Sequence, residues 1–206
     1  MRFKKKIIIV WKLFLGKINN KEIVLVQCGI GKVNAARTTQ ILIDKFDIDY
    51  IINVGVAGGL NDNLEIGDIV IGRKLVQHDF DITAGGHPKG YISKELGREF
   101  ISDSNLIDKC EKIIKKDIKV IIGTIATGDV FCNKVSLKEE VVKEFGADCI
   151  EMEGAATAQV CTLCDVPFIV IRSISDKPNG HNEIDFNTYL NLSVKRYQEL
   201  IKELLK

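Results

Sequence analysis

The sequence has few prolines and no long apolar run. Only three of its 206 residues are proline, and no low-complexity tract or internal repeat marks a linker, so we expect residues 1–206 to form a single domain. No stretch reaches the roughly 18 consecutive apolar residues of a membrane-spanning helix. The basic and then apolar N-terminus resembles a secretory signal, but Lys12 interrupts it and no small-residue cleavage site follows. We therefore predict an exposed strand, a turn at 16–21 and no membrane association.

An excess of charge of either sign is also lacking. The 29 basic and 28 acidic residues leave a formal net charge of +1. Because lysines and glutamates are mixed along the chain, the sequence carries no electrostatic footprint for nucleic acid. A small neutral or zwitterionic ligand fits this balance better than a polyanion.

The cysteines follow neither a disulfide pattern nor a metal-site pattern. Their irregular spacing, with several of the six in apolar runs, indicates free thiols in a reducing, cytoplasmic compartment. The pair Cys161 and Cys164 forms a CxxC, but none of the three histidines supplies a second ligand pair at zinc-finger spacing. This pair also falls near a helix end, whereas a thioredoxin motif opens a helix. We expect no metal and no cofactor.

Short β-branched runs alternate with helical patterns along the chain. We predict strands at 23–26, 50–54, 66–71, 119–124, 149–150 and 167–172, and helices at 33–46, 104–116, 137–145, 154–164 and about 185–204. Ser102 or Asp103 can cap the second helix, and Gly146 ends the third. The last helix carries one apolar stripe: Phe186, Leu190, Val194, Tyr197, Ile201 and Leu204. Buried strands separated by helices predict an α/β fold, a three-layer sandwich whose central sheet is mixed and mostly parallel.

Two glycine clusters follow predicted strands. The turn at 29–33 lacks the first glycine of a GxxxxGK loop and has Val33 where a magnesium-binding hydroxyl is required. The cluster at 55–59 does not match GxGxxG, and no ribose-binding acid follows at the required spacing. Both lie at the carboxyl ends of strands, where open α/β sheets bind ligands. Each is either a tight turn alone or a place where backbone approaches a ligand closely.

Four segments occur together in a recognisable order. They are CGIGKVNAA at 28–36, NVGVAGGL at 53–60, IEMEGAA at 150–156 and VIRSISD at 170–176, with HDFDIT at 78–83 between them. From about Phe14 to the C-terminus, this set resembles the nucleoside phosphorylase/nucleosidase superfamily. Its pattern is most similar to the 5′-methylthioadenosine/S-adenosylhomocysteine nucleosidases. The resemblance implies a nucleoside phosphorylase-like fold and a homodimer. It also implies hydrolysis of the N-ribosyl bond of both nucleosides, which releases adenine and a 5-thio-substituted ribose in methionine salvage.

The resemblance assigns chemistry to named residues. Cleaving a purine–ribose bond requires a proton for the leaving base, support for an oxocarbenium-like sugar and an activated water. Asp176 matches the family's proton donor, although a cap or turn at a strand end is the alternative for 175–176. Glu153 matches the residue that binds the ribose hydroxyls, although it could simply begin an acidic helix turn.

Further positions follow from the same resemblance. Phe131 stacks on adenine and Cys132 reads the base edge through its backbone, while Met152 lies against the sugar. Phe186 meets the 5′-thio substituent, or is a core residue. The remaining substrate-binding positions implied are Gly58, Arg172 and Ser175.

The chain also departs from the family pattern. The family begins with a strand and an acidic segment whose glutamate activates the attacking water, and this sequence has no glutamate before Glu22. We expect a chain without this segment to hydrolyse slowly, because general-base catalysis contributes about 10²- to 10⁴-fold.

Three alternatives remain open. A purine nucleoside phosphorylase needs a phosphate clamp, but Asn53 stands where hexameric phosphorylases have an arginine, and Arg172 alone is a poor clamp. Futalosine hydrolase acts on a related substrate. A non-catalytic purine-nucleoside-binding paralogue would fit a chain without its general base.

Overall fold

The chain alternates strands and helices over most of its length. The structure, a computed structural model, describes residues 4–8, 11–114, 118–177 and 186–206, with side chains for 12–114, 118–177 and 193–206. The strands are β1 (Lys4–Ile8), β2 (Trp11–Ile18), β3 (Lys21–Val26), β4 (Ile51–Gly59), β5 (Ile69–Gln77), β6 (Phe100–Ile101), β7 (Val120–Thr127), β8 (Cys149–Glu151) and β9 (Phe168–Asp176). The helices are α1 (Lys32–Lys45), α2 (Ser104–Ile113), α3 (Val135–Phe145), α4 (Gly154–Leu163) and α5 (Phe186–Leu204), with a short 3₁₀ turn at Thr83–Gly85.

The main sheet is mixed and closes on itself. Its strand order is β6-β5-β7-β8-β4-β9, and β9 also pairs with β5. Parallel pairing joins β5 to β7, β7 to β8 and β4 to β9, whereas β4–β8, β5–β6 and β5–β9 are antiparallel. The sheet is therefore mixed as predicted, with less parallel pairing than expected and a closure that the strand pattern did not reveal.

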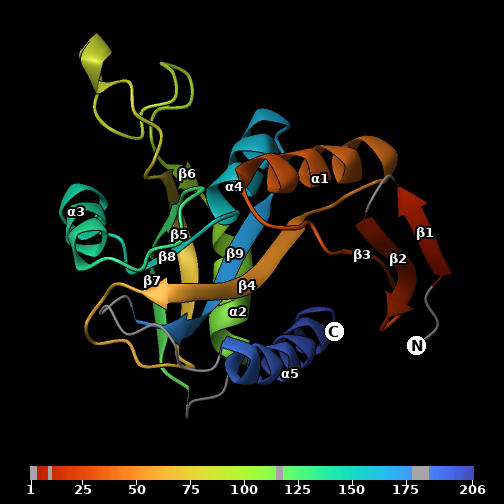
Figure 1. Ribbon diagram of the computed structural model, residues 1–206. Helices are drawn as coiled ribbons and strands as arrows, with labels where there is room; N and C mark the ends of the chain where they lie inside the picture. Colours follow the sequence, from red (N-terminus) through yellow and green to blue (C-terminus); the bar gives the residue numbers. More distant parts are fainter. Residues whose placement is uncertain (1–3, 9–10, 115–117, 178–185) are drawn as a thin grey trace.

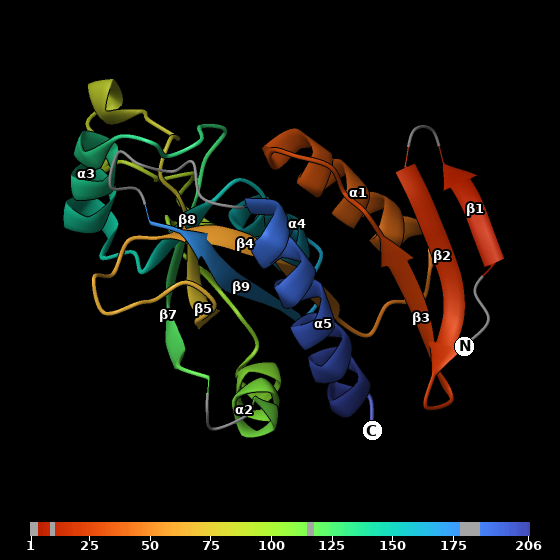
Figure 2. The ribbon, with the colours of Figure 1, turned by 60° about the horizontal axis from the view of Figure 1, so that its bottom comes forward.

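Helices cover both faces of this sheet. Helices α1 and α4 lie on one side, and α2 and α5 lie on the other (Figure 1; Figure 2). Successive residues of a strand point to opposite faces, and β9 shows this alternation. Val170 packs in a cluster with Ala155 and Ala158 of α4, whereas Ile169 and Ile171 pack with Leu106 of α2 and Tyr197 of α5. The predicted helical layers on the two faces of a sheet are confirmed.

The ends of two helices follow the sequence signals. Asp103 caps α2, because its Oδ1 accepts a hydrogen bond of 2.9 Å from the Leu106 backbone N–H. Gly146 ends α3 in the left-handed conformation, with φ of 60°.

The stripe predicted on α5 is wrong at Val194, which is 45% exposed. Leu200, which the stripe omitted, is 5% exposed and buried beside Tyr197 and Leu204. The buried positions of α5 thus recur at 193, 197, 200 and 204, which is one face of a 3.6-residue period. Phe186 begins α5, but its side chain and that of Leu190 lie outside the described residues.

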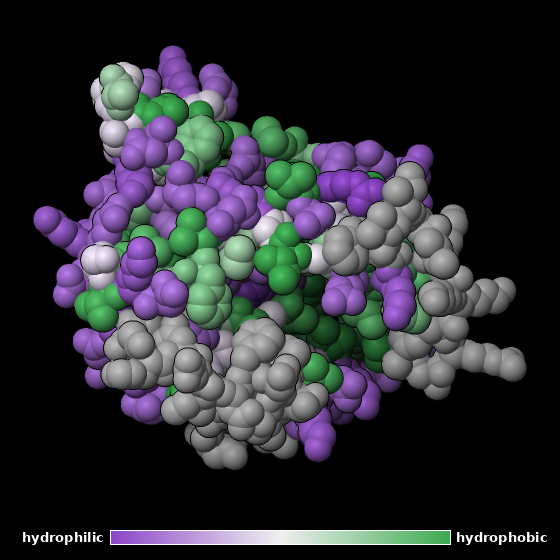
Figure 3. All heavy atoms as spheres, viewed as in Figure 1, coloured by the Kyte–Doolittle hydropathy of each residue, from purple (hydrophilic) through white to green (hydrophobic). Residues whose placement is uncertain are grey.

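A second, antiparallel sheet of β1, β2 and β3 lies apart from the main sheet (Figure 2). Asn19 and Asn20 form its predicted turn with positive φ values of 49° and 65°. Along 51–57, β4 pairs with β9 on one side, and no described strand pairs with its other edge. A hollow with hydrophobic residues at its base opens between β4 and the three-stranded sheet (Figure 3).

The predicted free thiols are confirmed, since all six cysteines are unpaired and four of them are buried. None of the described helices has the length and apolar character required to cross a bilayer.

Candidate functional site

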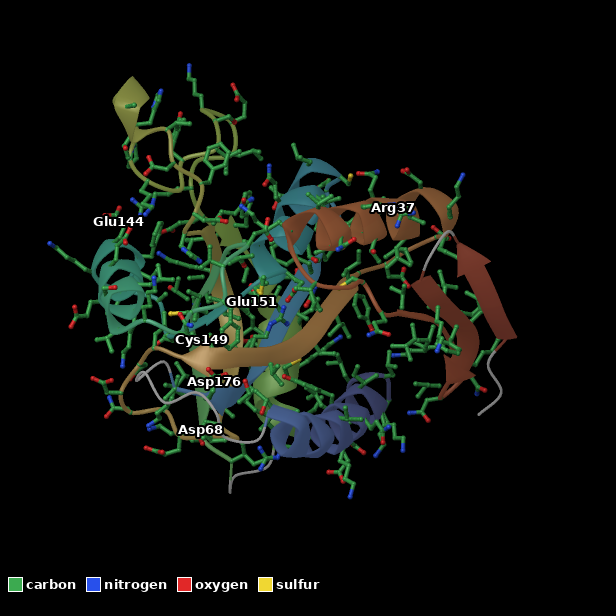
Figure 4. All side chains as sticks on the ribbon, viewed as in Figure 1. Arg37, Asp68, Glu144, Cys149, Glu151 and Asp176 are labelled. Carbon is green, nitrogen blue, oxygen red and sulfur yellow. The ribbon has the colours of Figure 1, made fainter. Side chains whose placement is uncertain are left out.

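A pocket opens where β4, β8 and β9 end. It is lined by Gly58, Val130, Phe131, Cys132, Ile150, Glu151, Met152 and Asp176. Gly58 of β4 lies at its centre, because it is in register with Ile150 of β8 on one side and with Asp176 of β9 on the other. Five residues that the sequence predicted for the site are thereby brought together: Gly58, Phe131, Cys132, Met152 and Asp176. Figure 4 shows Glu151 and Asp176 close to these strand ends, far from Arg37 and Glu144 at the periphery.

Asp176 is held at one end of the pocket. It is the last residue of β9, and the Ser175 hydroxyl lies 2.7 Å from its Oδ1 and 3.4 Å from the Ala57 carbonyl oxygen. The register between β4 and β9 shifts between Ala57 and Gly58, which brings Gly58 opposite Asp176. Ser175 is 2% exposed, so its contact orients the carboxyl from inside the protein.

Arg172 and Glu151 form a buried ion pair at the pocket, with Glu151 in its lining and Arg172 behind it. The Arg172 Nη2 lies 2.5 Å from Glu151 Oε2, and the two side chains are 1% and 2% exposed. Arg172 also donates to the side-chain oxygen of Asn53 at 2.8 Å and to the backbone oxygens of Asn53 and Ile171 at 3.3 and 3.0 Å. With its Nε bond of 3.1 Å to Glu151, all five guanidinium N–H donors have partners in the protein.

Glu151 also caps helix α4. Its carboxylate accepts backbone N–H groups of Glu153 at 3.0 Å and of Gly154 at 2.8 and 2.9 Å, and it accepts the Thr127 hydroxyl. Thr127 in turn accepts the Ala155 N–H at 2.7 Å. The first N–H groups of a helix lack intrahelical partners and carry partial positive charge, so a carboxylate there is favourable. These hydrogen bonds of Glu151 therefore hold in place the turn that carries Met152 and Glu153.

Glu153 faces the glycine turn that follows β3. The backbone N–H of Gly31 donates to its Oε1 at 2.9 Å. Burial raises the pKa of Glu153 and the nearby charge of Glu151 raises it further, against the lowering effects of the Gly31 N–H and the Arg172 charge. The net result is a pKa above the ordinary value of a glutamate, so this carboxyl takes up a proton at a higher pH than most.

Arg172 and Ser175, two other residues predicted for the site, are not among the described residues that line the pocket. Arg172 lies behind the pocket with every donor engaged, and Ser175 contacts Asp176 from inside the fold. The side chain of Phe186 lies outside the described residues. Contact of these three residues with a substrate stays a prediction.

Sequence reasoning missed the supporting residues of the site. Gly31, Asn53, Thr127 and Glu151 orient the predicted ones, and three of them lie in the four quoted segments. Glu151 had a readable signal, because a carboxylate just before a helix start is a capping pattern. Thr127 had none, because only the fold brings β7 beside β8.

The arrangement suits a ligand with a flat ring and hydroxyl groups. Phe131 and Val130 offer apolar surface at the mouth, with 59% and 48% of each exposed. Asp176 can exchange a proton with a ring nitrogen, while Glu153 can accept hydrogen bonds from hydroxyl groups.

Known proteins resemble this chain in sequence and in fold. Residues 3–206 match the family model described as the Phosphorylase superfamily. The chain is 42% identical over 197 residues to a 5′-methylthioadenosine/S-adenosylhomocysteine nucleosidase of Staphylococcus haemolyticus, covering 95% of this chain and 86% of that one. The Campylobacter jejuni nucleosidase structure of the same name is 34% identical with a TM-score of 0.93, covering 98% and 89% of the two chains. A Helicobacter pylori futalosine hydrolase is 33% identical with a TM-score of 0.93, covering 98% and 87%.

Replacing Glu151 by glutamine should destabilise the protein strongly. The substitution leaves the Arg172 charge buried without its counter-charge, and breaking a buried pair in this way costs about 3–5 kcal/mol. Urea unfolding followed by circular dichroism measures the loss. Glu22→Gln is the matched control, because the Lys17–Glu22 pair has side chains that are 64% and 85% exposed, and it should leave the unfolding midpoint unchanged. Equal midpoints for the two variants would show that the buried pair contributes little.

Proposed function

The chain belongs to the phosphorylase superfamily and, within it, to the 5′-methylthioadenosine/S-adenosylhomocysteine nucleosidases, and from this membership we propose that it hydrolyses the N-ribosyl bond of those two nucleosides. The products are adenine and the corresponding 5-thio-substituted ribose. The observation that carries the proposal is the pocket that gathers Asp176, Phe131 and Met152, with Glu153 on the adjoining turn.

The proposed chemistry uses these side chains in order. The adenine ring stacks on Phe131, and the carboxyl of Asp176 transfers its proton to the purine N7 as the bond between the base and the ribose breaks. Electrons of that bond leave with the base, so the sugar develops oxocarbenium character. Glu153 accepts hydrogen bonds from the ribose hydroxyls and places negative charge near the developing cation. Water then adds to the anomeric carbon and gives up a proton to a general base.

Water is favoured over phosphate as the nucleophile by the surroundings of Arg172. A phosphate clamp needs guanidinium donors aimed at the anion. All five donors of Arg172 are engaged by Glu151, Asn53 and Ile171, and the ion pair neutralises its charge. Futalosine hydrolysis is a less favoured candidate, because the Staphylococcus haemolyticus relative, at 42% identity, is named for the thio-nucleosides, whereas the futalosine hydrolase is 33% identical.

Methylthioadenosine should yield adenine and a free thio-ribose, with a rate that does not depend on phosphate. The measurement is chromatography of the products with and without phosphate, using inosine and futalosine as competing substrates. Formation of a ribose 1-phosphate would contradict hydrolysis, and faster cleavage of futalosine would move the protein to that neighbouring activity.

Binding of methylthioadenosine should weaken as the pH falls toward the raised pKa of Glu153, because the charge-assisted contact with ribose needs the ionised carboxylate. In Glu153→Gln the affinity should be lower by about 10- to 100-fold and should lose this acid-side dependence. Asp176→Asn is the matched variant, and it should keep binding while turnover falls by about 10²-fold or more. Calorimetric titration between pH 4.5 and pH 8 gives the affinities. A Glu153→Gln variant with the native pH profile would exclude the proposed contact.

We also propose that catalysis by this domain is completed by a strand and an acidic segment of the kind with which the family begins. Two features support this proposal: the edge of β4 along 51–57, with which no strand of the described residues pairs, and the hydrophobic hollow beside it. An added strand there would pair with β4 and carry its acidic continuation to the carboxyl ends of the strands.

Extending the chain by such a segment should raise turnover by about 10²- to 10⁴-fold, the contribution of a general base. The matched control carries the same extension with its glutamates replaced by glutamine, which repairs the sheet edge without supplying a base. Equal rates for the two extended chains would assign any gain to folding alone. Full activity in the 206-residue chain would show that another residue acts as base.

We further propose a cytoplasmic homodimer that acts in methionine salvage. Exposed apolar residues beside the pocket support pairing, since Ile30 and Val33 are 73% and 77% exposed. We include the segment 78–83 in the proposed interface; His78 is already buried within one chain at 2% exposure, whereas Phe80 and Ile82 are only partly buried and can contact a second copy. Light scattering at micromolar concentration tests the dimer.

A further inference from the structure

Asp79 connects two segments of the site from a position just beyond β5. Its Oδ1 accepts a hydrogen bond of 2.7 Å from the Lys32 side chain, and its Oδ2 accepts one of 2.8 Å from the Asp129 backbone N–H. Asp129 closes the triangle, because its own Oδ1 accepts the Lys32 backbone N–H at 2.8 Å. The loops that follow β3, β5 and β7 are thereby joined through two carboxylates.

Gly31 lies directly beside this triangle. Gly31 adjoins Lys32 and donates the 2.9 Å hydrogen bond to Glu153. It has a φ of 94°, and a Cβ there would lie 3.0 Å from Asp129 Oδ1, so both the conformation and the space call for glycine. Gly31 is also the N-cap of α1 but offers no side chain to cap it. Asp129 supplies the missing acceptor from another loop, at the end of the helix that attracts negative charge.

The other side of the triangle adjoins the pocket wall. Asp129 directly precedes Val130, Phe131 and Cys132, which line the pocket. Asp79 itself is not among the lining residues, so any effect on a ligand passes through the two loops that it joins.

Lys32 and Asp79 form an ion pair that is largely buried. The side chains of Lys32 and Asp79 are 19% and 21% exposed. Burial raises the pKa of Asp79, but the hydrogen bonds from Lys32 and the Asp129 N–H, with the Lys32 charge, outweigh burial and lower that pKa overall. Lys32 also donates to Gln77 at 3.2 Å, and Gln77 donates to Gln159 of α4 at 2.6 Å. The triangle is thus anchored to the same helix that Glu151 caps.

We propose that Asp79 is a positioning residue for nucleoside binding, which holds Gly31 against Glu153 and Phe131 at the pocket mouth. The proposal rests on the proposed function, in which Glu153 binds the ribose. It goes further by naming a residue outside the pocket that positions one donor to Glu153, the Gly31 N–H. Because the Gly31 N–H lowers the pKa of Glu153, releasing Gly31 should raise that pKa.

The test compares Asp79→Asn with Asp62→Asn in the full chain. Asp62 is the matched control, since it also pairs with a lysine, Lys138 at 2.6 Å, but its side chain is 91% exposed and it lies in none of the three loops of the triangle. Carbon-13 NMR titration of the ligand-free protein, with the Glu153 signal assigned by its absence from Glu153→Gln, gives the pKa of Glu153 directly. The affinity for methylthioadenosine is measured over the same pH range.

Asp79→Asn should raise the Glu153 pKa, move the acid-side loss of nucleoside affinity to higher pH, and weaken binding by about tenfold, the value of one hydrogen bond. Asp62→Asn should change none of these. If Asp79→Asn unfolds the chain, Lys32→Met removes the same pair from the other side and should shift the Glu153 pKa in the same direction. An unchanged Glu153 pKa in a folded variant would overturn the proposal. If Asp79→Asn raises the Glu153 pKa but the unsubstituted chain does not bind methylthioadenosine, the proposed function is overturned and the positioning role of Asp79 is not. The two outcomes are separable because the pKa is measured without ligand.

Discussion

The buried pair of Arg172 and Glu151 is the constraint on which the rest of the site depends. Two opposite charges with 1% and 2% exposure require full hydrogen bonding, and the fold supplies it from β4, β7, β9 and the start of α4. Satisfying Glu151 fixes the turn before α4, and that turn carries Met152 and Glu153. Satisfying Arg172 engages Asn53, whose side-chain nitrogen also donates to Thr157 of α4 at 2.9 Å. The hydrogen bonds that the buried pair requires thus fix the turn that carries Met152 and Glu153 beside the pocket.

Carboxylates only two residues apart perform different tasks because their surroundings differ. Glu151 faces a guanidinium and helix N–H groups, which stabilise its charge. Glu153 has lost much of its hydration and sits near a second negative charge, with one strong donor in Gly31. The first residue is structural, and the second has a raised pKa and is available to a ligand.

Much of this organisation is readable in the sequence, and the limits have physical reasons. The helices and strands follow local periodicity, and the glycine clusters and the segments at 150–156 and 170–176 point to the strand ends where the pocket lies. Local patterns carry no information on which strands pair, so the closure of β5 on β9 and the contact of Thr127 with Glu151 were not foreseeable. The error at Val194 has another cause, because apolar residues lie on more than one face of α5 and apolarity alone does not distinguish the exposed Val194 from the buried Leu200.

Closure of the main sheet has a consequence for how the polypeptide acquires its structure during synthesis. Both neighbours of β4, namely β8 and β9, come from the last third of the chain, and β9 also completes the pairing of β5. While the chain emerges from the ribosome, the edges of β4 and β5 that pair with β8 and β9 stay unpaired until this last third has been synthesised. Pairing strands so distant in sequence costs loop-closure entropy before the new contacts lower the free energy, so the closed sheet should assemble late and slowly. The nascent polypeptide is therefore most prone to aggregation before β9 has emerged.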